Sequence, residues 1–233
     1  MFLSIIIPTL NCIDDLKNNL YNLVCQNQSK FEIIIVDGYS NDGTIEFLKK
    51  LRLSNLKIIQ ETPTGVYEAM NKGAQIANGD FIIFLGSDDV LIPNIIDYLC
   101  EKITNKKTIY YGNSLFPKAN ILYAGRFNKF KLFRKNICHQ SIIYPTNLIQ
   151  KNKFDTSYKI LADYHFNLNF WKSKNYNWEY LPKTISIYND YTGLSKEVKD
   201  IKFKEDRPRI ILKSLGFFFY LLEKSKSFIK KYS

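Results

Sequence analysis

Two adjacent carboxylates, Asp88 and Asp89, are the residues of this chain best suited to hold a divalent metal ion. They follow Phe81–Leu85, a short apolar run bounded by polar residues, which predicts a buried strand. Side-by-side carboxylates repel each other unless a cation or hydrogen-bond donors relieve them. Mg²⁺ or Mn²⁺ does this with oxygen ligands and usually also holds a substrate phosphate. The alternative is structural, because Ser87 or Asp88 could cap a helix that begins near Pro93.

Strands and helices alternate through the first hundred residues and would place these carboxylates at the edge of a sheet. The predicted strands cover 2–8, 32–36, 56–60 and 81–85, and the predicted helices cover 13–26, 44–53, 66–77 and 93–104. Such alternation with short connections specifies a parallel sheet with helices on both faces. Thr9 and Asp37 also directly follow strands, so we expect them to share one sheet edge with Asp88 and Asp89.

The regular alternation weakens after residue 105. Further strands are predicted at 108–112, 120–123, 137–144 and 178–188, and a helix is predicted at 162–171. The chain shows no internal repeat and no low-complexity linker. We therefore interpret the second half as an extension of the same sheet, not as an independent domain.

Charge is unevenly distributed along the chain, whose net charge is +11. Residues 1–100 contain 7 Lys and Arg against 12 Asp and Glu, whereas residues 101–233 contain 26 against 10. This pattern indicates a neutral-to-acidic catalytic half joined to a basic half that faces something anionic. The basic residues are not organised around a recognisable RNA or DNA motif, so no nucleic-acid partner is expected.

The basic half ends in the most apolar segment of the chain, residues 210–222, which is too short to span a bilayer. Basic residues flank or interrupt it: Arg207, Arg209, Lys213, Lys224, Lys226, Lys230 and Lys231. Aromatic residues with a basic fringe are typical of a helix that lies on an anionic membrane surface. The alternative is a helix that packs back on the domain and leaves its lysines in solvent.

The cysteines and the N-terminus indicate a cytoplasmic location. The four cysteines are scattered without a CxxC pair, so neither a zinc site nor a disulfide framework is expected. The first residues lack the basic segment of a secretory signal and lead directly into a predicted strand. Together with the basic tail, this predicts a cytoplasmic protein bound peripherally to the inner face of the plasma membrane.

Seven short motifs occur in the order seen in one known enzyme family. They are SIIIPTLN at 4–11, VDGYSNDGT at 36–44, GVYEAMNKG at 65–73, FLGSDD at 84–89, YYGN at 110–113, CHQS at 138–141 and LADYHF at 161–166. Over about residues 3–190 the chain resembles family 2 glycosyltransferases, particularly the bacterial branch that builds surface polysaccharides. The resemblance implies a GT-A (Rossmann-like) α/β fold, a nucleotide-sugar donor, expected to be UDP-linked, a Mn²⁺ or Mg²⁺ cofactor and inversion at the anomeric carbon.

The resemblance also implies a division of the chain and roles for single residues. Residues 1–105 would bind the nucleotide sugar, 106–195 would bind the acceptor, and 196–233 would form a basic helical tail. The nucleotide-sugar site would comprise Pro8, Thr9 and Asn11 along the pocket, Asp37 at the base, Ser40 in the same loop, Lys72 near the diphosphate and Asp88 at the ribose. Asp89 would ligate the metal, and Asp163 matches the position of the general base, which must lie within hydrogen-bond reach of the acceptor hydroxyl.

Two of these residues have structural alternatives. Asp163 could instead be the N-cap of the helix predicted at 162–171. His139 could contact the diphosphate or the metal as a neutral imidazole, or it could be a hydrogen-bonded core residue of the strand predicted at 137–144.

Two positions depart from the pattern of the family. Pro63 stands where related sequences usually have Asp, which could change how the wall around residues 62–64 binds the donor. Gly86 stands where the branch commonly has Asn, so a side chain is missing near the expected metal.

The favoured function is an inverting sugar transfer to a lipid-linked oligosaccharide at the inner membrane face. A non-catalytic nucleotide-binding or nucleic-acid-binding module is the alternative, with weak support from net charge. A nicotinamide dehydrogenase is disfavoured because no GxGxxG follows the first strand.

Overall fold

The computed structural model describes residues 2–123, 125–189 and 199–232, with side chains described as far as residue 225. The expected boundary between 106–195 and 196–233 lies outside the described residues, as do the side chains of Lys226, Lys230 and Lys231.

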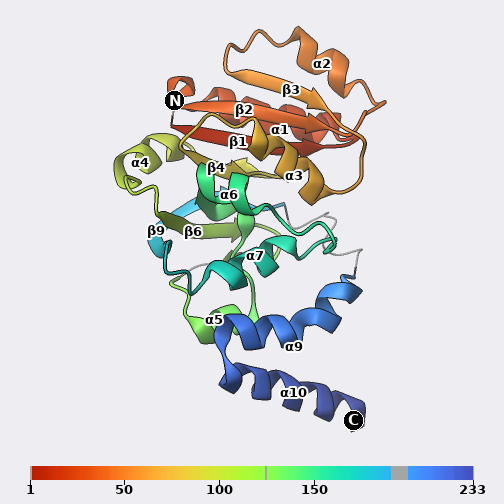
Figure 1. The fold of residues 1–233 in the computed structure, drawn as a ribbon. Coiled ribbons are helices and arrows are strands. Elements are labelled where there is room, and N and C mark those ends of the chain that lie inside the picture. Colours follow the sequence, from red (N-terminus) through yellow and green to blue (C-terminus); the bar gives the residue numbers. More distant parts are fainter. Residues whose placement is uncertain (1, 124, 190–198, 233) are drawn as a thin grey trace.

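Within the described residues, nine strands form one sheet in the order β3-β2-β1-β4-β8-β6-β9-β5, with β7 paired to β6 (Figure 1). The strands are β1 (Leu3–Thr9), β2 (Phe31–Asp37), β3 (Leu56–Gln60), β4 (Phe81–Phe84), β5 (Val90–Leu91), β6 (Thr108–Phe116), β7 (Ile121–Tyr123), β8 (Ile142–Pro145) and β9 (Asn177–Ile187). The first four are parallel, which confirms the expected α/β architecture. The second half continues the same sheet as expected, but its pairing is mixed because β8 is antiparallel to both β4 and β6.

Helices cover both faces of this sheet (Figure 1). They are α1 (Ile13–Val24), α2 (Thr44–Lys50), α3 (Val66–Gln75), α4 (Ile95–Lys102), α5 (Lys129–Arg134), α6 (Thr146–Asn152), α7 (Ala162–Phe170), α9 (Ile201–Leu215) and α10 (Phe217–Tyr232). Successive side chains of a strand point to opposite faces, so Ile6 joins the core beneath α3, α6 and α7. Its neighbours Ile5 and Ile7 join the core beneath α1, α2 and α4.

Side-chain amides on one face of α1 fix the segment that carries the two carboxylates. Asn19 Nδ2 donates to the carbonyls of Gly86 and Asp89, at 2.9 and 2.7 Å. One and two turns further along, Asn22 donates to the carbonyl of Leu91 and Gln26 to that of Ile92. Asn19 and Asn22 share one face of α1, and Gln26 lies just beyond the end of the helix, so α1 and the residues directly after it hold the segment from Gly86 to Ile92.

We expect Asn19→Leu to lower the free energy of unfolding by about 2 kcal/mol, because two carbonyls lose their donor. Sugar transfer should fall further than this stability loss explains, because the backbone of Asp89 is no longer held. The matched control is Asn22→Leu, which removes the same kind of bond at Leu91. Chemical denaturation and transfer assays on both variants measure the difference, and equal activity losses would contradict a positioning role for Asn19.

The strand predicted at 137–144 is wrong in its first part. Residues His139–Ser141 form a 3-10 helix, and only Ile142–Pro145 form β8. Side-chain hydrogen bonds explain the turn: Ser141 Oγ donates to the carbonyl of Asn113 and contacts the hydroxyl of Ser186. The polar side chains of CHQS thus determine the backbone conformation of this segment, although the apolar residues on either side favour a strand.

The C-terminal tail is helical, as expected, and consists of two helices. Gly216 separates α9 from α10 and has a φ of 102°, a left-handed conformation that favours glycine. Part of α10 packs back on the domain, because Phe219 is buried against Phe133 of α5. Arg207 of α9 joins the three helices, binding Glu223 at 2.8 Å and the carbonyl of Phe133 at 2.6 Å. Arg207 therefore holds helices of the domain together. The prediction that it belongs to the basic fringe of the apolar segment is wrong.

Candidate active site

Asp88 and Asp89 lie just beyond the carboxyl end of β4, which pairs with β1 on one side and with the antiparallel β8 on the other. Asp89 is buried, while Asp88 is partly exposed. Asp89 Oδ2 accepts a hydrogen bond from Gln140 Nε2 at 2.6 Å, and its Oδ1 accepts one from the backbone N–H of Asn189 at 2.9 Å. Neither Ser87 nor Asp88 caps the following helix, because α4 begins at Ile95 with Asn94 at the N-cap position. The structural alternative for this acidic pair is therefore wrong.

The acidic pair is electrostatically unfavourable as it stands. Burial raises the pKa of the Asp88 carboxyl to about 6, and the adjacent charge of Asp89 adds to the shift. Burial also raises the pKa of Asp89, although the donors Asn189 and Gln140 and the nearby His139 act in the opposite direction. Both shifts have the sign expected when carboxylates lack a compensating cation.

Gly86 allows the two carboxylates to fold back over the backbone. A Cβ at this position would lie 2.5 Å from Asp89 Oδ2 and 2.9 Å from Asp88 Oδ1, closer than nonbonded atoms can approach. The glycine that departs from the pattern of the family is therefore required by the positions that these carboxylates adopt.

We expect Gly86→Ala to weaken Mn²⁺ affinity by about tenfold or more, because the new methyl group displaces both carboxylates. Ser87→Ala is the control, because it adds no atom to the same loop. Calorimetric Mn²⁺ titrations in the presence of the nucleoside diphosphate measure the effect. Unchanged affinity in Gly86→Ala would mean that these side-chain positions are not the ones that bind metal.

The loops after β1 and β2 are tied together at the same sheet edge. Thr9 and Asp37 are paired residues at the ends of the two strands, which confirms that they share an edge with the acidic pair. Asn11 donates its N–H to Ser40 Oγ at 2.9 Å and accepts the N–H of Asn41 at 2.9 Å. Asn11 has a φ of 48°, a left-handed conformation that this two-way contact supports. The loops after β1 and β2 are thus connected through Asn11 and Ser40, next to Pro8 and Thr9 at the end of β1.

Asp37 fixes its own loop. Its Oδ1 accepts the hydroxyl of Ser40 at 2.5 Å, and its Oδ2 accepts the N–H of Ser40 at 3.0 Å. The side chain is fully buried, with Gln60 Nε2 at 3.3 Å from the same carboxylate. Contact between Asp37 and a nucleotide base stays a prediction.

Pro63 and Lys72 lie on the side of this loop pair. A Cβ on Gly38 would come within 3.1 Å of Pro63 Cβ and of Leu10 Cδ1, so Pro63 packs against the nucleotide loops. Lys72 Nζ is 3.3 Å from Glu61 Oε2, at the end of α3 distant from Gly65. The structure thus pairs Lys72 with a carboxylate, and its expected contact with a diphosphate stays a prediction.

Asp163 is buried in the first turn of α7 and is held by two side chains from other elements. Tyr67 of α3 donates its hydroxyl to Asp163 Oδ1 at 2.8 Å, and Asn136 Nδ2 donates to Oδ2 at 2.7 Å. The N-cap residue of α7 is Leu161, so Asp163 is not the N-cap. The carboxylate nevertheless accepts the N–H of Tyr164 at the helix N-terminus, which stabilises its negative charge.

His139 and Gln140 connect the two acidic centres. His139 Nδ1 lies 3.7 Å from Asp163 Oδ2, and the next residue, Gln140, binds Asp89. The imidazole is about one quarter exposed and belongs to the 3-10 helix, so its interpretation as a core residue of a strand is wrong. One dipeptide therefore places a partly exposed imidazole between the expected metal ligand and the expected base.

The acidic pair suits a divalent cation. Mg²⁺ and Mn²⁺ commonly use one or two carboxylates and complete their shell with water and substrate phosphate oxygens. Among the residues that the structure describes, no cluster of three or more His, Cys, Asp or Glu is arranged to hold a metal. Asp88 and Asp89 provide carboxylates whose raised pKa a cation would reverse, so these residues fit such an ion when a diphosphate supplies further oxygens.

Four contributors to the site were missed from the sequence. Gln140 and Tyr67 lie inside quoted motifs, and their neighbours His139 and Gly65 could have drawn attention to them. Asn19 belongs to a helical series of amides that periodicity could have revealed. Asn136 carries no local signal, because its contact with Asp163 depends entirely on tertiary structure.

Solved structures share this fold. Residues 1–349 of S. aureus TarS, in complex with UDP-GlcNAc, match with a TM-score of 0.70 and 21% identity, over 91% of this chain and 66% of that chain. A longer TarS structure is covered to 40% of its length, so this chain spans less than half of that protein. A mannosyltransferase from Pyrobaculum calidifontis, in complex with GDP-Man and Mn²⁺, matches with a TM-score of 0.62 and 14% identity, over 91% of this chain and 62% of that one. The fold is that of the GT-A glycosyltransferases.

Sequence comparison gives the family. A PGL/p-HBAD biosynthesis glycosyltransferase of Mycobacterium bovis (strain BCG / Pasteur 1173P2) is 32% identical over 215 residues, covering 88% of this chain and 83% of the relative. The TarP poly(ribitol-phosphate) β-N-acetylglucosaminyltransferase of Staphylococcus aureus (strain N315) is 25% identical, covering 81% and 63%. The model of Glycosyl transferase family 2 matches residues 4–162, and the chain belongs to that family. The resemblance noted from its motifs is thereby confirmed, and the chain is a glycosyltransferase.

Proposed function

We propose that this protein transfers a sugar from a UDP-linked donor to a saccharide hydroxyl, with inversion at the anomeric carbon. The observation that carries the proposal is the His139–Gln140 dipeptide, which joins Asp89 to Asp163. It gives one site with two carboxylates in different surroundings. Both accept hydrogen bonds from the protein, but Asp89 stands beside the carboxylate of Asp88, whereas Asp163 has the hydroxyl of Tyr67 and the amide of Asn136 as neighbours.

Each carboxylate then has a distinct task. Asp89 would hold a Mn²⁺ or Mg²⁺ ion, which would supply positive charge to the leaving diphosphate. Asp163 accepts the proton of the acceptor hydroxyl while that oxygen attacks the anomeric carbon. Tyr67 and Asn136 hold the carboxylate of Asp163 in one orientation, and His139, at 3.7 Å from Asp163, would contact the diphosphate. A single displacement with one base and no covalent intermediate inverts the anomeric centre.

The nucleotide would bind along the loops after β1 and β2. Asn11 and Ser40 already fix these loops against each other, and Asp88 stands next to them for the ribose. The TarS structure in complex with UDP-GlcNAc supports a UDP-linked donor. The preformed loops mean that binding requires little ordering of this part of the chain.

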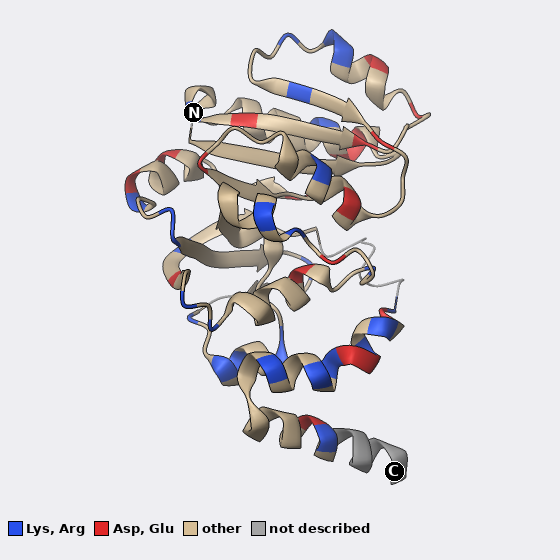
Figure 2. Cartoon of the chain, in the orientation of Figure 1, with Lys and Arg blue, Asp and Glu red and all other residues tan. Residues whose placement is uncertain are grey.

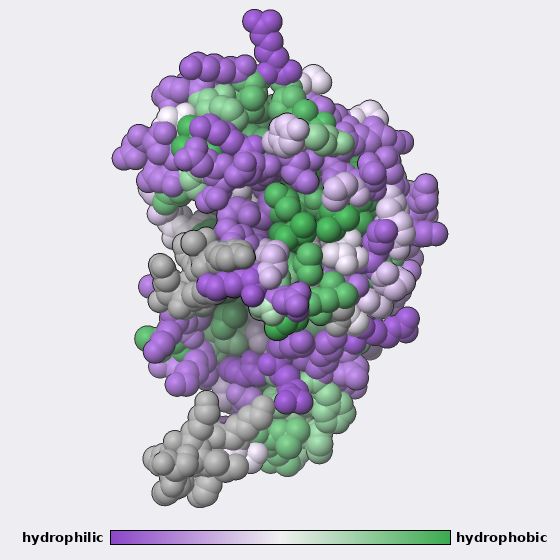
Figure 3. Space-filling model, turned by 180° about the vertical axis from the view of Figure 1, so that it is seen from behind, coloured by the Kyte–Doolittle hydropathy of each residue, from purple (hydrophilic) through white to green (hydrophobic). Residues whose placement is uncertain are grey.

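The acceptor is proposed to be a lipid-linked saccharide, because the tail presents an apolar surface. We define the aromatic patch as Phe130, Phe217, Phe218 and Leu221, which are 59%, 64%, 58% and 51% exposed. Phe130 and Phe218 are in ring contact at 6.2 Å, so α5 and α10 contribute to one surface. Figure 3 shows apolar side chains gathered at the end of the molecule where α10 begins.

Basic residues accompany the aromatic patch. Lys and Arg recur along α9 (Figure 2), and Lys129, Lys213 and Lys224 are exposed. Aromatic side chains with a basic fringe bind the surface of an anionic leaflet. We propose that the patch docks on the cytoplasmic leaflet, where a lipid-linked acceptor would be presented. Among the described residues, no helix has the length and apolar character required to cross a bilayer.

A thermal-shift panel of nucleotide sugars, with and without Mn²⁺, tests the donor proposal. A bound donor stabilises the folded state, by about 2.7 kcal/mol at a hundredfold excess over its dissociation constant. We expect one UDP-sugar to raise the melting temperature, and more strongly with Mn²⁺ than with EDTA. Stabilisation by nucleotides without any turnover would favour the non-catalytic binding module. No response to any nucleotide sugar would overturn the donor proposal.

Vesicle flotation tests the membrane proposal. The wild-type protein should float with vesicles that contain anionic phosphatidylglycerol and should not float with neutral phosphatidylcholine vesicles. Replacing Phe217 and Leu221 with Ser should abolish flotation and leave transfer to a soluble acceptor intact. Ser at the exposed Tyr21 of α1 is the control, since this residue lies outside the aromatic patch. Flotation of the Phe217 and Leu221 variant at the wild-type level would overturn docking by the patch.

A further inference from the structure

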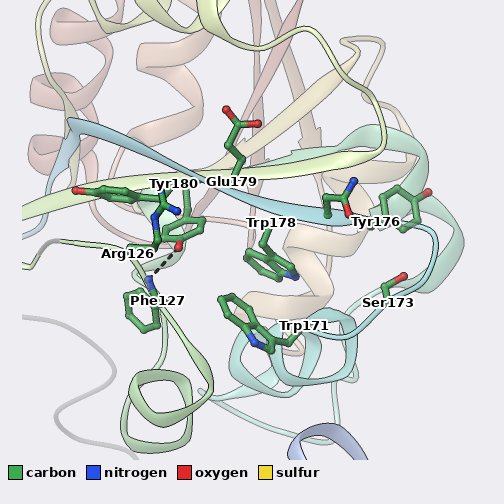
Figure 4. A pocket seen from close by; sticks show the side chains of 10 residues that line it. Arg126, Phe127, Trp171, Ser173, Tyr176, Trp178, Glu179 and Tyr180 are labelled. Atoms are coloured by element: carbon green, nitrogen blue, oxygen red, sulfur yellow. Dashed lines mark hydrogen bonds between the residues drawn. The ribbon is translucent and has the colours of Figure 1, made fainter.

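A second pocket lies apart from the acidic centres, against β6 and the start of β9, and has a volume of about 360 Å³. Neither Asp89 nor Asp163 lines it. Figure 4 shows Trp171 and Trp178 packed next to each other in the middle of the pocket lining. Arg126 lies at one end, and Ser173 and Tyr176 lie at the other. The pocket therefore has an aromatic middle and polar ends.

Three of the aromatic side chains that line the pocket have their polar atoms engaged by the protein. Trp178 Nε1 donates to the carbonyl of Phe170 at 3.0 Å, and the Tyr180 hydroxyl donates to Asn113 Oδ1 at 2.8 Å. The Tyr111 hydroxyl accepts the N–H of Phe127 at 2.9 Å. These bonds fix the rings in place. The surface that they offer a ligand is therefore carbon, presented by rigid ring faces and edges.

The two tryptophans form a prebuilt platform. Their ring centroids are 5.2 Å apart with an interplanar angle of 43°, so the two indoles contact each other and form one aromatic wedge, whose outer faces line the pocket. Both side chains are only partly buried, although Trp is among the costliest residues to leave in contact with water. Tyr111 packs edge-on against Trp178 from below, at 6.0 Å. A rigid aromatic wedge that is open to solvent is a binding surface with little ordering cost.

The chemistry of the pocket selects among ligands. Among the described residues that line the pocket, Arg126 is the cation and Glu179 is the carboxylate, and no acidic pair is present that could hold a metal, so a nucleoside diphosphate is poorly matched. A lipid chain would bury the charged side chain of Arg126 against hydrocarbon, which is costly. A sugar ring has carbon–hydrogen faces for the indoles and hydroxyl edges for the polar ends. Pockets of this kind, apolar with a few polar groups, are typical of ligand sites.

A chain of side-chain contacts links the pocket with the catalytic centre. Phe127 in the pocket contacts the ring of Tyr123 at 6.4 Å, and the Tyr123 hydroxyl donates to the carbonyl of Asn136. Asn136 in turn donates to Asp163. A glycan whose reacting hydroxyl lies at Asp163 and that extends past Asn136 and Tyr123 would place a further sugar unit against the exposed faces of the two indoles.

We propose that this pocket is a distal subsite for a sugar unit of the acceptor glycan. The inference rests on the proposed function, since it assigns the pocket to the same acceptor. It gives the enzyme a means to select acceptors by a unit that does not react, while the reacting hydroxyl is selected at Asp163.

Tryptophan fluorescence tests the proposal directly, because Trp171 and Trp178 are the two tryptophans of the whole sequence. The probes are neutral oligosaccharides from a glycan array, titrated without donor or metal. We expect at least one of them to give a saturable change in tryptophan emission. The change should persist in Asp163→Asn, because this site does not use the base. Absence of a saturable change with every oligosaccharide would overturn the proposal.

Kinetics of two variants test whether binding in the pocket contributes to sugar transfer. Trp178→Ala should raise the KM for the acceptor by about tenfold with kcat nearly unchanged, because stacking on the ring is lost. Tyr21→Ala, at an exposed aromatic outside the pocket, should leave KM unchanged. If Trp178→Ala does not fold, the fluorescence titration of the wild-type protein still decides. An unchanged KM in a folded Trp178→Ala variant would also overturn the subsite.

The two proposals fail in distinguishable ways. Oligosaccharide binding at the tryptophans without any donor binding or transfer would overturn the proposed function and would keep the pocket as a saccharide site. Donor binding and transfer with no oligosaccharide signal at the tryptophans would overturn the subsite alone. A fluorescence change caused by UDP alone would assign the pocket to the nucleotide and overturn the subsite.

Discussion

Asp163→Asn is expected to lower kcat by about 1,000-fold, the range in which a general base contributes to proton transfer. The amide has the same size but cannot take the proton of the acceptor hydroxyl. Donor affinity should stay at the wild-type value, because Asp163 is held by Tyr67 and Asn136 and not by the nucleotide loops. Steady-state kinetics together with calorimetric titration of UDP and Mn²⁺ measure both quantities.

Tyr67→Phe is the matched control for this prediction. It removes one hydrogen bond at 2.8 Å from Asp163 and leaves the carboxylate itself in place. We expect a loss of about tenfold in kcat, in keeping with the loss of about one hydrogen bond to a charged group. An Asp163→Asn variant that turns over at the wild-type rate would show that another group is the base.

Asp89→Asn is expected to abolish the stabilisation by Mn²⁺ and to reduce transfer by about 1,000-fold or more. The reason is that Asp89 is the proposed direct ligand of an ion that supplies several kcal/mol of charge stabilisation to the leaving diphosphate. Thermal shifts with UDP, with and without Mn²⁺, report the metal effect apart from turnover. The variant should bind UDP about as the wild-type protein does when EDTA is present.

Folding must be separated from metal binding in this variant, because Asp89 is buried and bonded to Gln140 and Asn189. Gln140→Leu is the control, since it removes the donor at 2.6 Å and keeps the carboxylate. It should lose part of the Mn²⁺ response, whereas Asp89→Asn should lose all of it. A full Mn²⁺ response in folded Asp89→Asn would contradict the role of Asp89 as a ligand.

The parallel half of the fold could be predicted because its rules are local. The apolar runs of β1, β2, β3 and β4 are short and separated by helical spacing, so a parallel sheet follows from the alternation. That order also places Thr9, Asp37 and the acidic pair on one edge, as the structure shows. The antiparallel entry of β8 beside β4 could not be predicted in this way, because long-range pairing has no signature in periodicity.

The site could be predicted only in part, because its second layer is built from contacts distant in sequence. The acidic pair and Asp163 stand in recognisable motifs, but their roles stay predictions. His139 was expected either in a strand core or at the diphosphate. Its place beside Asp163 follows from a 3-10 helix that the hydroxyls of Ser141 and its partners determine. Such a network of polar side chains is not periodic, so neither strand nor helix spacing reveals it.

The central claim is that an ion at Asp89 holds the diphosphate within reach of His139, with Asp163 on the acceptor side. The most direct measurement is the anomalous diffraction of Mn²⁺ in crystals grown with UDP. The account predicts a Mn²⁺ peak coordinated by Asp89 and by diphosphate oxygens, with the uridine along the loop of Asn11 and Ser40. A Mn²⁺ peak elsewhere, or a diphosphate bound away from Asp89, would contradict it.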